Sequence, residues 1–129
     1  MCGILGIYSS ENKKDLINRV EHGINSLNHR GPDSKGLCNF DIKENKSSLV
    51  LGHTRLSIID LTPNANQPMQ VNHGRYTIVY NGEIYNYKEL REELIRNGHI
   101  FKTDSDTEVL VTLWAKLGDK GLKKIIGMF

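Results

Sequence analysis

Few cysteines, no long apolar run and no strong excess of charge set the first limits on this sequence. Only Cys2 and Cys38 are present, which excludes a disulfide framework and favours a reducing cytoplasm. No apolar run approaches the ~20 residues of a membrane span, and the N-terminus has no basic leader for export. Seventeen basic and fifteen acidic residues give a net charge of +2, too balanced for a nucleic-acid partner.

Metal and nucleotide sites are excluded by the same kind of absence. The histidines show no ligand-like spacing to one another or to a cysteine pair, which argues against zinc. The phosphate-binding patterns G-x-x-x-x-G-K-[ST] and G-x-G-x-x-G do not occur, so no cofactor is expected in this chain. What is present, 129 residues with 38% apolar and 25% charged side chains, matches one globular domain. The five histidines are His22, His29, His53, His73 and His99.

Hydrophobic periodicity predicts an α+β fold with mainly antiparallel sheets. Apolar residues at three- and four-residue spacing predict helices over 13–28 and 87–97. A Ser105–Glu108 capping box predicts a third helix, with Trp114 on its buried stripe. Short apolar runs predict strands at 2–8, 37–42, 49–52, 56–59 and 76–80, with turns at 29–36 and 43–48.

Cys2 is the first candidate for chemistry, because it directly follows an initiator Met that aminopeptidases remove before a small residue. Removal would place a free α-amine and a thiol on one residue. An amine with a reference pKa near 7.7–8.0 can act as the base for its own nucleophile. The alternative is that Cys2 is a small apolar residue buried on a strand.

Asn81 and Gly82 form the second candidate, with both a structural and a functional interpretation. Asn-Gly between apolar runs predicts a type I′ hairpin, which requires φ > 0 at both residues. A side-chain amide beside an exposed N–H would also suit a developing oxyanion.

Arg55 and Asp106 are a third pair with the chemistry of an amino-acid site. A fork-shaped cation suits an α-carboxylate, and an anion suits an α-ammonium. Without a ligand, Arg55 would be a solvent-facing strand residue, and Asp106 an acidic residue favoured at a helix N-terminus.

Motifs along the whole chain resemble one family. Their order resembles the N-terminal glutaminase domain of glutamine-hydrolysing asparagine synthetases, class II amidotransferases of the N-terminal-nucleophile hydrolase fold. The motifs are MCGILG at 1–6, HRGPD at 29–33, RLSIIDL at 55–61, QPM at 67–69, NGEIYN at 81–86 and SDTE at 105–108. One departure is NANQPM at 64–69, where the family usually has a Gly near QPM, and we expect no effect on catalysis.

The resemblance implies a role for each matching residue. Cys2 would attack the side-chain amide of glutamine, and Asn81 with the Gly82 N–H would form the oxyanion hole. Arg55 would bind the α-carboxylate, while Asp106 and the region of Glu83 would take the α-ammonium. The remaining pocket-lining residues would be Leu56, Ser57, Ile58 and Ile59.

The resemblance also implies an αββα sandwich and a larger protein. Residues 1–129 are expected to be the N-terminal portion of the amidotransferase domain, truncated at the C-terminal side. The synthetase domain, which would use ATP and Mg to make asparagine from aspartate, is absent. The closing apolar run at 125–129 is expected to continue as an inner strand of a complete domain. An unpaired edge there would favour self-association, so a homo-oligomer is compatible. The alternatives are a non-catalytic glutamine-binding or assembly module, or an amidotransferase feeding another acceptor.

Overall fold

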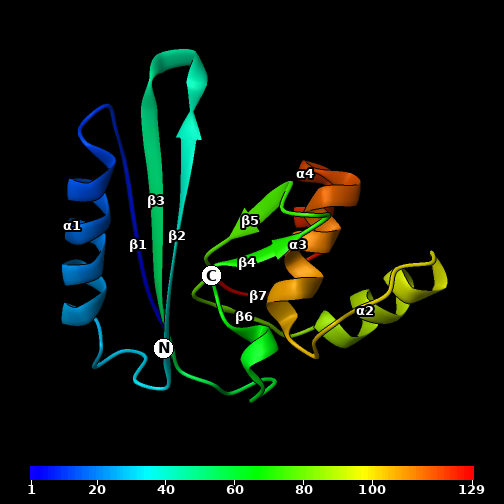
Figure 1. Ribbon diagram of the computed structural model, residues 1–129. Coiled ribbons are helices and arrows are strands. Elements are labelled where there is room, and N and C mark those ends of the chain that lie inside the picture. The colour runs from blue at the N-terminus through cyan, green and yellow to red at the C-terminus, as the bar shows by residue number, and fades with distance from the viewer. The chain divides into compact units, whose positions relative to one another are not determined.

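The computed structural model describes all residues, 1–129, and its helices and antiparallel strands form two units (Figure 1). This mixture confirms the α+β class. The first unit contains Met1–Ser57, Asn66–Pro68 and Val79–Asn81. The second contains Ile58–Ala65, Met69–Ile78 and Gly82–Phe129.

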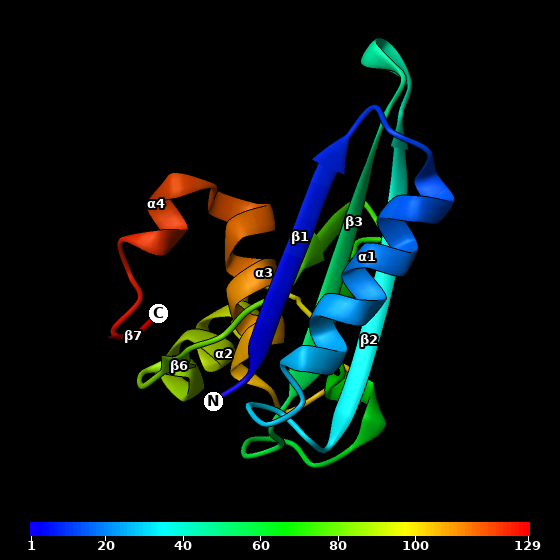
Figure 2. The same cartoon turned by 90° about the vertical axis from the view of Figure 1, so that its left-hand side faces the viewer.

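One helix covers one face of a three-stranded antiparallel sheet in the first unit, as Figure 2 shows. The strand order is β1-β3-β2, and Gly3 aligns with Thr54 while Ser34 aligns with Arg55. The start of β1, the start of β2 and the end of β3 therefore meet at one end of the sheet. The elements are β1 (Gly3–Ser9), α1 (Lys13–Ser26), β2 (Ser34–Ile42), a 3₁₀ turn (Lys43–Asn45) and β3 (Ser47–Arg55).

The core of this unit follows from the four-residue spacing on α1. Leu16, Val20 and Ile24 recur on one face of the helix and pack with Val50 of β3. After the buried Gly3, strand β1 alternates between exposed and half-buried positions, with Ile4 48% exposed. The strand predicted at 2–8 is therefore confirmed as a half-buried one.

The second unit is built from short strands and helices. Helix α3 packs against α2, α4 and the β4–β5 hairpin. Strand β6 pairs with β7, so of the predicted strand at 125–129 only Gly127 and Met128 join a sheet. None of the helices combines the length and apolar character that a membrane span requires. The elements are a 3₁₀ turn (Pro63–Ala65), β4 (Met69–Val71), β5 (Tyr76–Ile78), β6 (Glu83–Ile84), α2 (Tyr87–Arg96), α3 (Asp106–Leu117), α4 (Asp119–Leu122) and β7 (Gly127–Met128).

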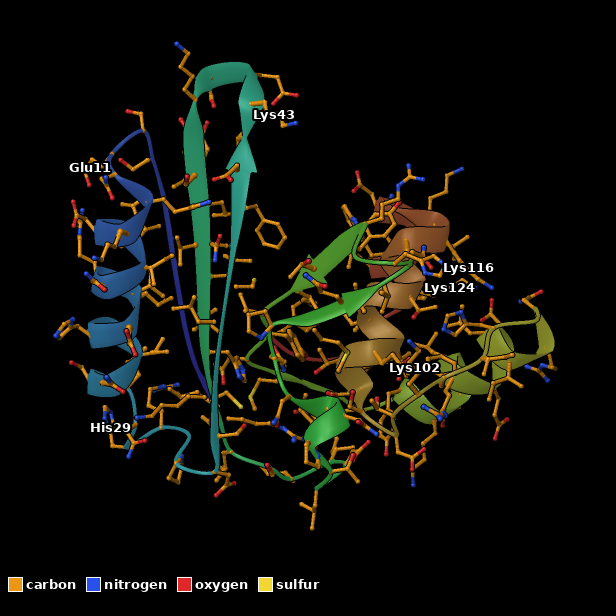
Figure 3. The ribbon with its side chains drawn as sticks, viewed as in Figure 1. Glu11, His29, Lys43, Lys102, Lys116 and Lys124 are labelled. Atoms are coloured by element: carbon orange, nitrogen blue, oxygen red, sulfur yellow. The ribbon has the colours of Figure 1, made fainter.

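One predicted strand and one predicted hairpin are corrected by the structure. The run at 49–52 is confirmed as a strand within the longer β3, whereas the run at 56–59 forms no strand. Neither Asn81 nor Gly82 has a positive φ, so no type I′ turn forms there. The hairpin turn lies earlier, between β4 and β5, where Asn72 (φ 52) and His73 (φ 56) take the left-handed conformation. The polar turn at 43–48 is confirmed, with Lys43 at the hairpin tip (Figure 3).

Candidate active site

Cys2 lies directly before β1, and its thiol is held against the backbone of Leu56. The Leu56 N–H donates to the Cys2 sulfur at 3.4 Å, and the thiol lies 3.8 Å from the Leu56 carbonyl oxygen. The carbonyl oxygen of Cys2 accepts a hydrogen bond from Arg30 Nε at 3.0 Å. Cys2 is half-buried and makes no disulfide.

Gly3 lets β1 approach β3 closely beside the thiol. Its N–H donates to Thr54 Oγ1 at 3.1 Å, and Thr54 Oγ1 in turn donates to the Leu27 carbonyl at 3.3 Å. A Cβ on Gly3 would lie 2.6 Å from Thr54 Oγ1 and 2.9 Å from Leu27 Cβ. The glycine of the MCGILG motif is therefore required by packing.

The HRGPD turn supports the chain on both sides of Arg55. A Cβ on Gly31 would lie 2.4 Å from the Thr54 carbonyl oxygen, so only glycine fits against that backbone. The Asp33 N–H donates to the Arg55 carbonyl at 3.0 Å, and the Ser57 N–H donates to Asp33 Oδ2 at 2.7 Å. Because Asp33 takes the Ser57 N–H and the Cys2 sulfur takes the Leu56 N–H, these two groups are not available to the β3 ladder.

Arg55 is the last residue of β3 and is 5% exposed, which contradicts the solvent-facing alternative. Arg55 Nη1 donates to Asn66 Oδ1 at 2.9 Å. The same oxygen accepts from Ser34 Oγ at 3.0 Å. A guanidinium held in this way is well placed to pair with a carboxylate, because its fork carries five donors.

Asn81 follows a residue whose backbone is held at both ends by side chains. The Tyr80 N–H donates to Gln67 Oε1 at 2.5 Å, and the Tyr80 carbonyl lies 3.2 Å from His53 Nε2. His53 is fully buried, and burial lowers its pKa below the usual range. The ring is therefore neutral near pH 7, with its proton on Nε2 to donate to the carbonyl.

Asp106 is the first residue of α3 and belongs, with Gly82 and Glu83, to the second unit. It is 6% exposed, and its Oδ2 accepts from the Ile84 N–H at 3.1 Å. Desolvation raises the pKa of Asp106, and the charge of Glu83 acts in the same direction against the N–H groups of Ile84 and Thr107. A buried carboxylate of this kind suits a cationic ligand group.

Ser105 and Glu108 stabilise the N-terminus of α3, as the capping box predicted. The hydrogen bonds of the Glu108 side chain differ from those of a standard capping box. Ser105 Oγ accepts from the Glu108 N–H at 3.2 Å. The Glu108 carboxylate accepts from the N–H groups of Lys102 (3.0 Å) and Thr103 (2.7 Å) instead of that of Ser105. Glu108 thus fixes the chain that leads into Asp106.

Ile58 and Ile59, also in the second unit, precede a loop that is hydrogen-bonded to the segment before Asp106. Ile58 is 73% exposed, whereas Ile59 is half-buried. Asp60 has a φ of 54°, and its Oδ2 accepts from the Asp104 N–H at 2.8 Å. This bond connects the loop after Ile59 to the segment before Asp106.

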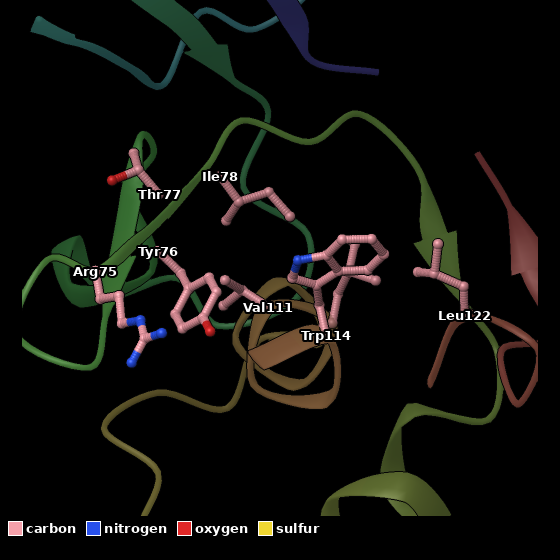
Figure 4. A pocket seen from close by; sticks show the side chains of 8 residues that line it. Arg75, Tyr76, Thr77, Ile78, Val111, Trp114 and Leu122 are labelled. Atoms are coloured by element: carbon pink, nitrogen blue, oxygen red, sulfur yellow. The ribbon is translucent and has the colours of Figure 1, made fainter. Parts of the chain in front are cut away.

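A separate pocket of about 440 Å³ lies in the second unit (Figure 4). It contains none of the predicted site residues. Trp114, predicted to be core, is 40% exposed on its wall, because α3 turns this ring toward Ile78 and Leu122 instead of the buried side of the helix. The lining residues are Arg75, Tyr76, Thr77, Ile78, Leu110, Val111, Trp114 and Leu122. No three His, Cys, Asp or Glu side chains gather to hold a metal ion.

Sequence reasoning missed four residues that touch the candidate site. Asp33, His53, Asn66 and Gln67 hold Ser57, Tyr80 and Arg55 through the bonds given above. Asp33 belongs to the HRGPD motif and Gln67 to the QPM motif, although neither was assigned a role, and no motif contains His53 or Asn66. Asn66 and Gln67 lie in the NANQPM segment, whose departure from the family pattern we expected not to affect catalysis. Asn66 contacts Arg55, and Gln67 contacts the residue before Asn81.

Comparison with known proteins identifies the family to which this geometry belongs. The model of the glutamine amidotransferase domain matches residues 1–129. The chain belongs to the glutamine amidotransferase family. This confirms the resemblance that the motifs carried.

The curated relatives of this amidotransferase chain are longer proteins. It is 39% identical to asparagine synthetase [glutamine-hydrolyzing] 1 of Bacillus subtilis (strain 168), over 100% of this chain and 20% of the relative. It is 37% identical to asparagine synthetase [glutamine-hydrolyzing] 2 of Arabidopsis thaliana, over 100% and 21%. It is 33% identical to a glutamine–fructose-6-phosphate aminotransferase [isomerizing] of Sulfolobus acidocaldarius, over 95% and 24%. The chain thus spans a fifth to a quarter of these relatives.

Proposed function

We propose that this chain hydrolyses glutamine to glutamate and ammonia through a thioester on Cys2. The observation that carries the proposal is the hydrogen bond from the Leu56 N–H to the Cys2 sulfur. It joins the candidate nucleophile, Cys2, to Leu56, the residue directly after Arg55. Arg55 is the candidate group for binding the α-carboxylate of the substrate. Met1 is 61% exposed, so an aminopeptidase could reach it and free the α-amine of Cys2.

Cys2 supplies both the nucleophile and the base of the reaction, its thiol and its own α-amine. The amine takes the thiol proton, and the thiolate forms a bond to the side-chain carbonyl carbon of glutamine. The tetrahedral oxyanion accepts hydrogen bonds from the Asn81 side chain and the Gly82 N–H. Its collapse breaks the C–N bond, and the protonated amine gives its proton to the leaving ammonia. Water, deprotonated by the same amine, then attacks the thioester and releases glutamate and the thiol.

Substrate recognition is assigned to two charged groups and a lining segment. Arg55 pairs with the α-carboxylate, and Asp106, with Glu83 nearby, receives the α-ammonium. Leu56, Ser57, Ile58 and Ile59 line the pocket, and the first of these uses its backbone to hold the thiol.

In the full-length protein, we propose that the ammonia passes to an ATP-dependent synthetase domain, which makes asparagine from aspartate. Residues 1–129 would then be the N-terminal portion of the amidotransferase domain, with glutamine as the only small-molecule substrate bound by this part. The names of the Bacillus and Arabidopsis relatives support this acceptor. The Sulfolobus relative supports the alternative that a similar domain feeds a different acceptor.

The deciding experiment combines labelling with turnover. A glutamine-like electrophile should label Cys2 in the Met1-free protein, and glutamate release should be lost in Cys2→Ala. Cys38→Ala is the matched control, because this thiol lies in β2 and burial raises its pKa away from the thiolate form. Release that persists in Cys2→Ala would overturn the proposal. Absence of labelling would favour a non-catalytic module instead.

A further inference from the structure

We propose that Asn66 and Gln67 are a positioning pair, which holds the carboxylate-binding Arg55 with one side chain and the peptide before Asn81 with the next. The inference rests on the proposed function. Neither residue contacts the substrate: Asn66 acts through Arg55, and Gln67 acts through the peptide that leads to Asn81.

Asn66 holds the guanidinium. Its Oδ1 accepts from Arg55 Nη1 at 2.9 Å and from Ser34 Oγ at 3.0 Å, so the amide oxygen is itself fixed by a second donor. An arginine side chain has many rotamers, and ordering it before the substrate arrives lowers the entropy lost on binding. Asn66 thus fixes the orientation of the guanidinium through one of its nitrogens.

Gln67 holds the other group. Its Oε1 accepts from the Tyr80 N–H at 2.5 Å, and His53 Nε2 holds the carbonyl of the same residue at 3.2 Å. With both ends of Tyr80 fixed, the backbone of Asn81 starts from a defined position. An oxyanion donor must lie within a few tenths of an ångström of its ideal position, because its effect depends on a bond of about 2.7–3.1 Å.

Packing fixes the pair on the sheet. A Cβ on Gly36 of β2 would lie 2.0 Å from the Gln67 carbonyl oxygen, so the segment rests directly on that strand. Gln67 is 7% exposed. The pair is therefore anchored to the same sheet that carries Arg55, and it connects two groups that are 26 positions apart in the numbering.

Kinetics separate positioning from a merely structural role, because the two side chains act on different steps. Asn66→Ala should raise KM for glutamine about tenfold with little change in kcat, the loss typical of one hydrogen bond to a charged group. Gln67→Leu should lower kcat about tenfold at nearly constant KM, since it displaces an oxyanion donor. Gln67→Glu keeps the acceptor oxygen and should recover most of kcat.

Matched controls and a folding safeguard complete the test. Asn64→Ala and Gln70→Leu change exposed residues of the same types nearby and should leave both constants at the parent values. If Gln67→Leu does not fold, Gln67→Asn, which keeps the amide but withdraws its oxygen, should show the same loss of kcat. Equal changes of KM and kcat in both variants, or no change, would overturn the positioning pair. Cys2→Ala, measured in parallel, distinguishes this result from failure of the proposed function, in which Cys2→Ala would retain activity.

Discussion

The backbone N–H of Leu56 donates to the sulfur of Cys2 across 54 positions of the chain. This bond is one of a series made by consecutive residues at the end of β3. His53 holds Tyr80, Thr54 holds Gly3, Arg55 holds Asn66 and Leu56 holds Cys2. The residues at the end of β3 thus fix the candidate nucleophile, Cys2, and the segments around it through bonds that no periodic pattern predicts.

Arg55→Lys should raise KM for glutamine strongly. Lysine keeps the charge but has no fork, so it cannot pair with both Asn66 and a carboxylate in the geometry of Arg55. The loss of a paired, desolvated interaction corresponds to about 2–3 kcal/mol, or roughly a 30- to 150-fold rise in KM. Glutamate release at varied glutamine measures it. Arg75→Lys, at an exposed arginine of the second unit, is the control, and an unchanged KM in Arg55→Lys would leave Arg55 with a structural role.

Asn81→Ala should lower kcat by about 10²–10³ with little change in KM, the usual cost of removing one oxyanion donor. The structure makes this variant informative, because Asn81 is not in a type I′ turn and its φ does not require asparagine. Thermal melting should therefore be close to that of the parent protein.

Asn72→Ala gives the reverse pattern and serves as the control. Asn72 does have a positive φ (52°), which alanine tolerates poorly. This variant should melt at a lower temperature with kcat unchanged. A loss of kcat in Asn72→Ala, or unfolding of Asn81→Ala, would contradict the separation of the two roles.

Periodicity predicted the helices well because an amphipathic stripe is a local property of the sequence. The expected helix over 13–28 is α1 (Lys13–Ser26), and the one over 87–97 is α2 (Tyr87–Arg96). Ser105 caps α3 as expected, because a cap also needs only neighbouring residues. The candidate residues came from motifs, and the family match supports those motifs without testing each role.

The errors occurred where distant contacts decide the conformation. Residues 56–59 look like a strand, but the Cys2 sulfur and the Asp33 carboxylate take the N–H groups of Leu56 and Ser57. Asn81 follows a peptide that His53 and Gln67 hold from far along the chain. These hydrogen-bond partners lie outside the local sequence, so secondary-structure propensity could not predict them.

As the pH is lowered, glutamine binding should weaken at a higher pH than an ordinary aspartate would cause, because Asp106 is protonated earlier. Desolvation raises its pKa, and only the ionised form can pair with an α-ammonium. KM should therefore rise as pH falls through this raised pKa, which a pH profile of KM would measure. A profile that follows an ordinary aspartate would contradict the burial argument.

The same shift predicts a trade-off between stability and binding. Because the pKa of Asp106 is raised in the folded state, its contribution to stability is full below the unfolded pKa and is lost as pH rises through the folded one. Asp106→Asn should thus melt at or above the parent temperature near pH 7 while KM for glutamine rises sharply. A lower melting temperature would show that the ionised carboxylate stabilises the fold.

Glu108→Ala should destabilise the second unit and weaken glutamine binding together. Glu108 is 4% exposed, and its carboxylate accepts from the N–H groups of Lys102 and Thr103, so its removal leaves one half-buried and one buried donor unpaired. At about 1–3 kcal/mol for each such group, we expect a loss of about 2–4 kcal/mol in the free energy of unfolding, measured with urea. Since these bonds fix the chain that leads into Asp106, KM should rise as well. Glu92→Ala, at an exposed position of α2, should change the free energy of unfolding by no more than about 0.5 kcal/mol and leave KM at the parent value. A similarly small effect in Glu108→Ala would mean that water replaces the carboxylate at no cost.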